Sequence, residues 1–313
     1  MDGENFSVEA GKPILCKAAV ARKPGEPLVI EEIIVAPPSH HEVRVRIICT
    51  SLCHSDVTFW KLKDLPAVFP RILGHEAIGV VESVGEDVDE VVEGDVVIPV
   101  FLPDCGDCAD CKSKKSNLCS KLPFQLSPWM PRDKTSRFTN LKGEVLYHFL
   151  NVSSFSEYTV VDTAHIVKID PSIPPSKACL LSCGVSTAKK FGVTDFVNVE
   201  ECGDTPVSQG WGKTVILGVE KPGSQISLPC ADVVHSGKTL TGALFGGLKA
   251  KSDIPILLKR YMDKELELDK FVTHEVNFED INKAFDLLLE GKSLRCVIWM
   301  DKQASYSKGV CIS

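Results

Sequence analysis

The first half of the chain alternates apolar and polar positions in the manner of short β-strands. Residues 43–47, Val-Arg-Val-Arg-Ile, change class at every position, which is the period of a strand with one face toward a core. Residues 28–35 and 95–100 are short runs rich in β-branched side chains, and residues 155–161 resume the pattern. This half therefore predicts a β-rich barrel or sandwich.

The second half predicts strands that alternate with helices. Residues 213–219, Lys-Thr-Val-Ile-Leu-Gly-Val, form a nearly continuous apolar run, as expected of a strand buried on both faces of a parallel sheet. Residues 194–199 predict a second strand of this kind. Prolines at 171, 174 and 175 mark the expected boundary between the two halves.

Two amphipathic helices are expected near the C-terminus. One begins near Asp253 with Pro255 in its first turn. The other follows Asp280 and stops at Gly291. Its apolar positions at helical spacing are Ile281, Ala284, Phe285, Leu288 and Leu289.

Length, charge and cysteine content narrow the class of protein. A chain of 313 residues with 44% hydrophobic residues is expected to form two domains. Its net charge of −7 argues against a nucleic-acid partner. The first ten residues lack the apolar core of a signal peptide, and no run approaches the roughly 18 apolar residues of a membrane span. We therefore expect a cytoplasmic protein whose 13 cysteines serve as metal ligands or reactive thiols.

Residues 103–142 break the strand pattern and contain a dense group of cysteines. Cys105, Cys108, Cys111 and Cys119 have the spacing C-x2-C-x2-C-x7-C, which lets one loop place four thiolates around a tetrahedral ion. Zinc is the expected occupant, and such a closed site is structural. An iron–sulfur cluster and four free buried cysteines are the alternatives. Three lysines, 112, 114 and 115, lie where they can offset the negative charge.

A second group of donors predicts an open metal site. Cys53 lies in Cys-His-Ser-Asp, His75 in Gly-His-Glu and Cys183 in Ser-Cys-Gly. Two thiolates and one imidazole leave the fourth tetrahedral position for water or substrate, which is typical of catalytic zinc. Taken singly, each residue is equally compatible with ordinary packing.

These motifs together resemble the zinc-containing medium-chain alcohol dehydrogenases, and most closely the plant alcohol dehydrogenase-like branch. The resemblance extends over nearly all of residues 15–302 and rests on GHEAIGVVESVGEDV at 74–88, CHSD, the cysteine loop, LSCGVST, KTVILGV, GALFGG and LRCVIWMDK. It implies an α/β fold with a β-rich GroES-like catalytic domain and a truncated Rossmann-like parallel-sheet domain. The implied divisions are residues 1–184 for the catalytic domain, 185–245 for the nucleotide-binding domain, 246–302 for a return to the catalytic domain, and 303–313 for a tail.

The resemblance also implies roles for individual residues. Two zinc ions are expected per subunit: Cys53, His75 and Cys183 would hold the catalytic one, and the loop cysteines the structural one. Asp56 would orient the zinc-bound histidine, and Glu76 would be the acidic neighbour of the metal. Ser55 would take the alcohol proton. Ser55, His75 and Phe101 would line the substrate pocket for an alcohol or aldehyde. The implied NAD contacts are His54 and Arg295 toward the phosphates and Leu217, Gly218, Val219, Ala243, Leu244 and Phe245 near the nicotinamide.

The glycine turn that a Rossmann fold uses for the pyrophosphate is missing. No G-x-G-x-x-G occurs, and Gly210-Trp211-Gly212 fails at its last position, Val215. Only 29 residues separate Cys183 from Lys213, whereas one βαβ unit takes roughly 30 or more. The resemblance to the family implies deletions after Thr187 and after Gln209 that together come to about 80 residues. We therefore expect weak or lost NAD binding.

Three functions are compatible with the sequence. The first is an NAD-dependent zinc alcohol dehydrogenase that oxidises an alcohol to an aldehyde or ketone, as a homodimer by family. The second is a catalytically impaired zinc-binding variant, produced by splicing or by a faulty gene model. The third, a zinc-free quinone reductase relative, is disfavoured because the zinc ligand set is complete.

Overall fold

The computed structural model describes residues 11–64, 68–184, 213–217, 225, 227, 230–237 and 239–302. The chain divides into two compact units. One consists of Met1–Cys183 together with Lys249–Ser313, and the other of Gly184–Leu248. The larger unit is therefore assembled from two separate parts of the chain.

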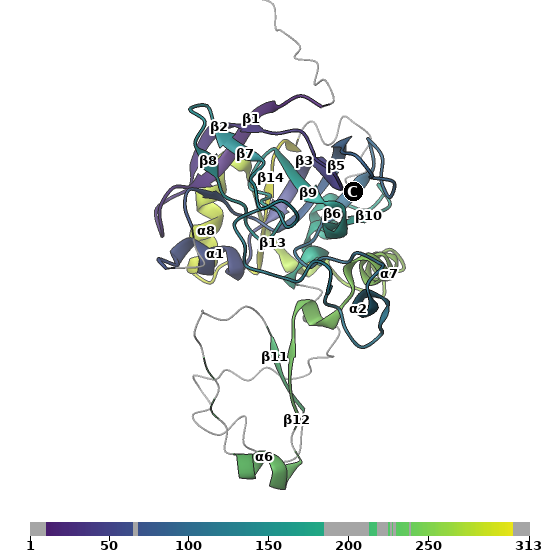
Figure 1. Ribbon diagram of the computed structural model, residues 1–313. Helices are drawn as coiled ribbons and strands as arrows, with labels where there is room; N and C mark the ends of the chain where they lie inside the picture. The colour runs from purple at the N-terminus through teal and green to yellow at the C-terminus, as the bar shows by residue number, and fades with distance from the viewer. Residues whose placement is uncertain are drawn as a thin grey trace, which may run out of the picture. The chain divides into compact units, whose positions relative to one another are not determined.

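The N-terminal strands of the larger unit form a five-stranded sheet (Figure 1). Seven consecutive residue pairs join its two longest strands in antiparallel register, from Ile14–Val35 to Val20–Val29. The strand order is β4-β1-β2-β7-β8. The strands are β1 (Ile14–Ala21), β2 (Val29–Val35), β4 (Arg71–Ile72), β7 (Phe138–Asn140) and β8 (Val145–Leu146).

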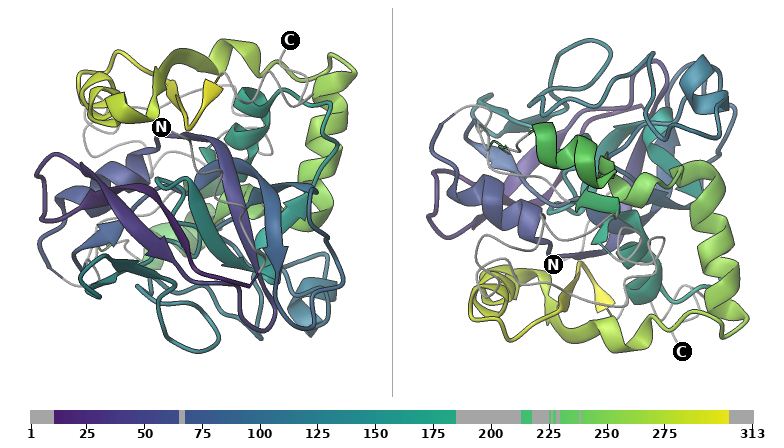
Figure 2. Two further views of the ribbon diagram at one scale, coloured as in Figure 1. Left: turned by 90° about the horizontal axis from the view of Figure 1, so that it is seen from above. Right: turned by 90° about the horizontal axis from the view of Figure 1, so that it is seen from below.

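A seven-stranded sheet forms the rest of the core. Its order is β10-β6-β5-β3-β14-β13, and β9 also pairs with β3. The strands are β3 (Glu42–Ser51), β5 (Glu76–Val84), β6 (Val96–Pro99), β9 (Tyr158–Asp162), β10 (Ile166–Lys168), β13 (Val272–Asn277) and β14 (Arg295–Trp299). Ala18 of β1 bridges Ser156, just before β9, and so links the two sheets. The left view of Figure 2 shows the purple N-terminal strands beside a teal strand.

The C-terminal part of the chain completes this larger sheet. β14 pairs antiparallel with β3, with Val297 opposite Ser51 and Trp299 opposite Cys49. β13 joins β14 in parallel, and a parallel pair needs a long crossover. The helix α8 (Ile281–Leu289) lies within that crossover.

The strand predictions for 28–35, 43–47, 95–100 and 155–161 coincide with strands, but two details differ. Arg44 was expected on a polar face, whereas its side chain is completely buried and its Nε lies 2.5 Å from Glu82 Oε2. The irregular stretch 103–142 includes β7, and β8 follows it, so strand structure resumes before residue 155. Strands of three and two residues are too short to produce a recognisable alternation.

The expected start of the helix near Asp253 was wrong. The helix α7 spans Ala250–Met262, so Pro255 is its sixth residue rather than part of its first turn. Asp253 acts as a capping residue from inside the helix, because its carboxylate accepts the backbone N–H of Lys249 at 3.0 Å. The other expected helix is α8; its face of Ile281, Ala284, Phe285 and Leu288 is buried, but Leu289 is exposed.

The remaining helices of the larger unit are short. They are α1 (His54–Lys61), α2 (Ala109–Lys112) and α3 (Pro175–Ala178), with 3-10 turns η1 (Thr163–His165), η2 (Cys179–Ser182), η4 (Asp269–Phe271) and η5 (Phe278–Asp280). Among the residues that the structure describes, no helix is long and apolar enough to cross a membrane.

The smaller unit contains a parallel strand pair. Its strands β11 (Lys213–Leu217) and β12 (Thr239–Ala243) are in register from Lys213–Thr239 to Leu217–Ala243, and α6 (Cys230–Ser236) lies between them in the chain. The short turn η3 (Phe245–Gly247) follows. This arrangement is the β-α-β order expected of a Rossmann-like unit. The strand predicted at 194–199 lies outside the described residues.

Candidate metal centres

The larger unit brings four potential metal donors together in its interior. Cys53, His75, Glu76 and Cys183 each offer one ligand atom, and these atoms lie within 4.8 Å of one another. Cys53 is the N-cap of α1, His75 directly precedes β5, and Cys183 follows η2. The first three are buried and Cys183 is half-buried.

Asp56 fixes the geometry of this group. Its carboxylate accepts the backbone N–H of Cys53 at 2.9 Å, which completes a capping box at the start of α1. The same carboxylate accepts the backbone N–H of Gly74 at 3.0 Å and lies 3.2 Å from Nδ1 of His75. One buried carboxylate thus holds two of the donor residues in place.

The contact with Asp56 determines which ring nitrogen of His75 is available. A carboxylate accepts the Nδ1–H, so the lone pair of the neutral ring lies on Nε2. This Nε2 atom is fully buried and makes no hydrogen bond among the described residues. A buried nitrogen left without a partner fits a metal ion, because such an atom otherwise costs free energy.

The charges in the group also fit a cation. Burial opposes protonation of His75, but the Asp56 carboxylate, together with Cys53, outweighs it and raises the pKa of the ring well above its usual value. A metal ion that binds Nε2 therefore displaces a proton from the ring. The Cys183 thiol lowers the pKa of Cys53 well below its usual value, against the opposing effect of burial. This shift favours the thiolate form of Cys53, which is the form that binds metal, while the pKa of Cys183 is raised by Cys53 and by burial.

Glu76 and Arg295 form a buried ion pair beside these donors. Nε of Arg295 lies 3.5 Å from Oε2 of Glu76, whose side chain is fully buried. The Glu76 carboxylate raises the pKa of Arg295. Arg295 is the first residue of β14. The pairing of β14 with β3 therefore places a positive charge beside Glu76 and the neighbouring donors.

Aromatic rings enclose the imidazole. Phe101 meets His75 edge-on with ring centroids 6.0 Å apart, and Phe149 does so at 5.7 Å. Phe124 in turn packs against Phe101 at 5.8 Å. Phe101 was expected at the site from the sequence. Phe149 and Phe124 were not, because only the fold brings Phe149 to His75 and Phe124 to Phe101.

The two residues that follow Cys53 differ in exposure. The Oγ of Ser55 lies 3.9 Å from Sγ of Cys53, and Ser55 is half-buried. A hydroxyl therefore borders the group of donors. His54 is exposed at the first position of α1.

The four loop cysteines form a second donor group. The ligand atoms of Cys105, Cys108, Cys111 and Cys119 lie within 4.8 Å of one another. Three of these sulfurs accept backbone N–H groups, from Cys108, Cys111 and Leu122, at 3.3–3.4 Å. Hydrogen bonds from Ser120 and from the backbone N–H of Cys111 lower the pKa of Cys108 to about 5. The chemistry of this donor set fits one tetrahedral zinc ion.

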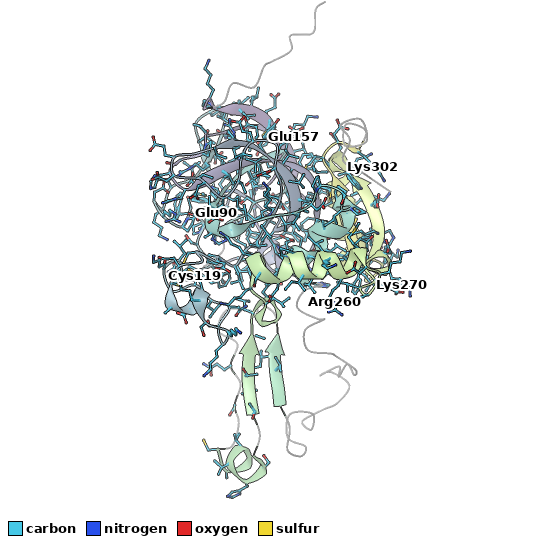
Figure 3. The ribbon with its side chains drawn as sticks, turned by 90° about the vertical axis from the view of Figure 1, so that its right-hand side faces the viewer. Glu90, Cys119, Glu157, Arg260, Lys270 and Lys302 are labelled. Carbon is cyan, nitrogen blue, oxygen red and sulfur yellow. The ribbon has the colours of Figure 1, made fainter. Side chains whose placement is uncertain are left out.

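The start of α7 supports this loop. Lys249, its N-cap, donates from Nζ to the backbone oxygens of Asp110 and Cys111. Figure 3 shows Cys119 at the end of the molecule where α7 begins, with Arg260 near the other end of that helix.

The proposed cofactor contacts are only partly described. Leu217 and Ala243 are paired at the ends of β11 and β12, and Leu244 and Phe245 follow β12. Gly218 and Val219 lie outside the described residues. All of these belong to the smaller unit, whereas His54 and Arg295 belong to the larger one.

Comparisons with known proteins identify the family. The model of the alcohol dehydrogenase GroES-like domain matches residues 39–171. The chain is 58% identical to alcohol dehydrogenase-like 7 of Arabidopsis thaliana over 375 residues, covering 92% of this chain and 96% of the relative. It is 40% identical to alcohol dehydrogenase 1 of Petunia hybrida, covering 93% and 98%.

Solved structures agree on the fold. An alcohol dehydrogenase zinc-binding domain protein from Burkholderia ambifaria has a TM-score of 0.79 at 22% identity, covering 93% of this chain and all of that one. Benzyl alcohol dehydrogenase from Acinetobacter calcoaceticus has a TM-score of 0.75 at 21% identity, covering 92% and 100%. The expected GroES-like plus Rossmann-like fold is confirmed, and the chain belongs to the plant branch of the zinc-containing medium-chain alcohol dehydrogenase family.

Proposed function

We propose that this alcohol dehydrogenase-type oxidoreductase performs its chemistry at Cys53, His75 and Cys183, which hold a catalytic zinc ion. The observation that carries the proposal is the buried Nε2 of His75, which has no hydrogen-bond partner among the described residues and lies among thiols. The loop cysteines hold a second, structural zinc ion. The reaction is oxidation of an alcohol to an aldehyde or ketone with NAD as the hydride acceptor.

Bound zinc supplies a Lewis acid that favours the alkoxide form of the alcohol near neutral pH. The surrounding residues do the rest. Asp56 keeps the proton of His75 on Nδ1 and so keeps Nε2 directed at the metal. Phe101 and Phe149 exclude water beside the imidazole. Ser55, on the accessible side of Cys53, accepts the alcohol proton and passes it toward solvent.

The NAD-binding half fits its cofactor poorly. The sequence lacks the glycine turn. The alignment with the Arabidopsis relative supports an internal deletion, because 375 positions are aligned but only about 288 residues of this chain, 92% of 313, take part in the alignment. About 87 aligned positions therefore face gaps in this chain. Micromolar affinity corresponds to a binding free energy of roughly 8 kcal/mol. The backbone N–H groups of the glycine turn and the ribose-binding acid, which this chain lacks, would contribute several kcal/mol of it.

The same observation favours a second candidate function. In it the chain is a zinc-binding variant with impaired turnover, which arose by splicing or from a faulty gene model. Sequencing the transcript across Thr187–Ala188 and Gln209–Gly210 tests its origin: in-frame joins at both places would indicate splicing, and their absence would indicate a faulty gene model.

Two measurements on the purified chain test the function. Elemental analysis should find two zinc ions per chain, reduced to one by His75→Ala and unchanged in the control His274→Ala. Alcohol-dependent formation of reduced nicotinamide, at NAD concentrations far above micromolar, should be lost in His75→Ala. Zinc without any turnover would support the second candidate, and absence of zinc would contradict both.

Assembly and location are part of the proposal. A cytoplasmic homodimer acting on a small alcohol or aldehyde is supported by the family alone. Light scattering of the purified chain at several concentrations tests the dimer. A constant monomer mass would contradict it.

A further inference from the structure

A third group of metal-binding side chains lies apart from the Cys53 centre and borders a hollow that Cys105 of the cysteine loop also lines. His40 and His41 end the loop between β2 and β3, and Asp87 follows β5. Each residue offers one ligand atom, and the three atoms lie within 4.8 Å of one another. Nδ1 of His40 is 3.2 Å from Oδ2 of Asp87. This spacing matches two ligands of one ion, because bonds of about 2.0–2.2 Å at tetrahedral angles separate neighbouring ligands by about 3.4 Å.

One ring nitrogen of His41 is held by a backbone oxygen, which leaves the other as the candidate ligand atom. Its Nδ1 lies 3.1 Å from the backbone oxygen of Asp87, which can only accept a hydrogen bond. Nδ1 therefore carries the proton and the lone pair lies on Nε2. The imidazoles of His40 and His41 have centroids 4.1 Å apart. A histidine held through one nitrogen by an oxygen acceptor, with the other nitrogen free, is the usual arrangement of a metal ligand.

The backbone holds these residues together before any ion binds. The N–H of His41 donates to Glu86 O at 2.8 Å, and the N–H of Gly85 donates to Glu42 O at 2.8 Å. At Gly85 a Cβ would lie only 1.8 Å from Ser39 O, so only glycine lets the two loops come this close. The site therefore loses little conformational entropy on binding.

Two of the ligand residues adopt an unusual backbone conformation. His41 has φ of 58° and Asp87 has φ of 54°. Left-handed backbone is unfavourable for residues with a side chain and persists where the surroundings enforce it, often at ligand sites. Here it occurs on both sides of the same histidine–aspartate contact.

The group is open to ions and is not opposed by free positive charge. His41 and Asp87 line a hollow of about 520 Å³. The two cations that also line it are already paired: Lys251 contacts Glu90, labelled in Figure 3, and Arg132 contacts Asp162. The pairing leaves the Asp87 charge available to a cation.

We propose that His40, His41 and Asp87 form a third metal site for a divalent transition ion, with water completing its coordination. Two imidazoles and one carboxylate suit Zn²⁺, Co²⁺, Ni²⁺ and Cu²⁺ rather than Mg²⁺ or Ca²⁺. The site is peripheral to the proposed catalytic centre, because it contains no cysteine and lies at the other end of β5 from His75 and Glu76.

The test uses the full-length, tag-free chain with zinc already at its cysteine centres and Ni²⁺ as the probe. Calorimetry should detect one additional Ni²⁺ per chain. His40→Ala, His41→Ala and Asp87→Asn should each weaken this binding about tenfold or more. The controls are His235→Ala, an exposed histidine on α6, and Asp89→Asn, an exposed aspartate next to the site; both should bind as the parent does.

X-ray absorption and zinc analysis make the outcome decisive. The bound nickel should show nitrogen and oxygen neighbours without sulfur, while the zinc content stays constant in every variant. Sulfur neighbours would mean that nickel had displaced zinc from a cysteine centre and would overturn the proposal. So would unchanged Ni²⁺ affinity in Asp87→Asn, a variant that keeps the side-chain shape.

Discussion

The carboxylate of Asp56 lies 3.2 Å from Nδ1 of His75, and both side chains are completely excluded from solvent. The same carboxylate caps α1 at Cys53 and holds Gly74. A single aspartate therefore connects the start of a helix, the turn before β5 and the ring that faces the proposed zinc ion.

Replacing Asp56 by asparagine should weaken zinc binding at the Cys53 centre by 10–100-fold. The amide keeps the shape of the side chain but loses the charge that favours the Nδ1–H form of His75. Competition with a chelator measures the affinity, and the loop zinc provides an internal reference. Asp64→Asn, an exposed aspartate beyond α1, is the control. Equal zinc affinity in both variants would contradict the role assigned to Asp56.

Replacing Cys111 by serine should release the loop zinc and lower the free energy of unfolding by several kcal/mol, because structural zinc contributes folding energy directly. One zinc ion per chain should remain. Cys230→Ser changes an exposed cysteine on α6 and should alter neither zinc content nor stability. Thermal unfolding with and without a chelator checks both variants. A Cys111→Ser protein with the parent's melting temperature would show that the loop folds without metal.

Stability should fall in mild acid because of His148. Burial, reinforced by the charge of Arg137, lowers the pKa of His148 to about 3. Its Nε2 accepts the backbone N–H of Arg137 at 3.1 Å, which requires the neutral ring. In the unfolded chain the His148 ring has its ordinary pKa of about 6.5, so in mild acid it binds a proton there while it stays neutral in the folded state. The stabilisation is present above pH 6.5 and is lost as the pH falls toward 3, with about 2 kcal/mol gone at pH 5.

His148→Gln isolates this effect. Glutamine keeps an acceptor for Arg137 but does not titrate, so the difference in unfolding free energy between pH 7 and pH 5 should be smaller by about 2 kcal/mol. Urea unfolding at the two pH values gives the difference. An unchanged pH dependence would show that His148 is protonated in the folded state.

Gly74→Ala should be far more destabilising than Gly143→Ala. Both glycines have positive φ, 91° and 80°, so each alanine costs about 1–2 kcal/mol in backbone strain. A Cβ at Gly74 would also lie 2.5 Å from Phe155 Cδ1 and 2.8 Å from the Phe155 nitrogen, whereas Gly143 faces open space. We expect a further loss of 1–3 kcal/mol at Gly74 together with weaker zinc binding. Equal losses in the two variants would mean that the crowding relaxes freely.

The sequence predicted the contacts between residues that are close in the chain and missed those between residues that are far apart in it. Cys53 and Asp56 are three residues apart, so their motif is visible without a structure. The pairing of Arg295 with Glu76 depends on β14 joining β3, and no periodicity indicates it. For Arg44 the pattern gave a wrong prediction. Its alternation with valine predicts solvent exposure, but the ion pair with Glu82 allows its side chain to be buried. Charged residues in strands are therefore assigned correctly only when their partners are known.

The pairing of β14 with β3 sets the order of events during protein synthesis. The ribosome releases β3 about 250 residues before β14, so β3 lacks this partner strand while the intervening residues are synthesised. The interrupted layout also means that Gly184–Leu248 can change in length while both parts of the sheet beside His75 remain encoded.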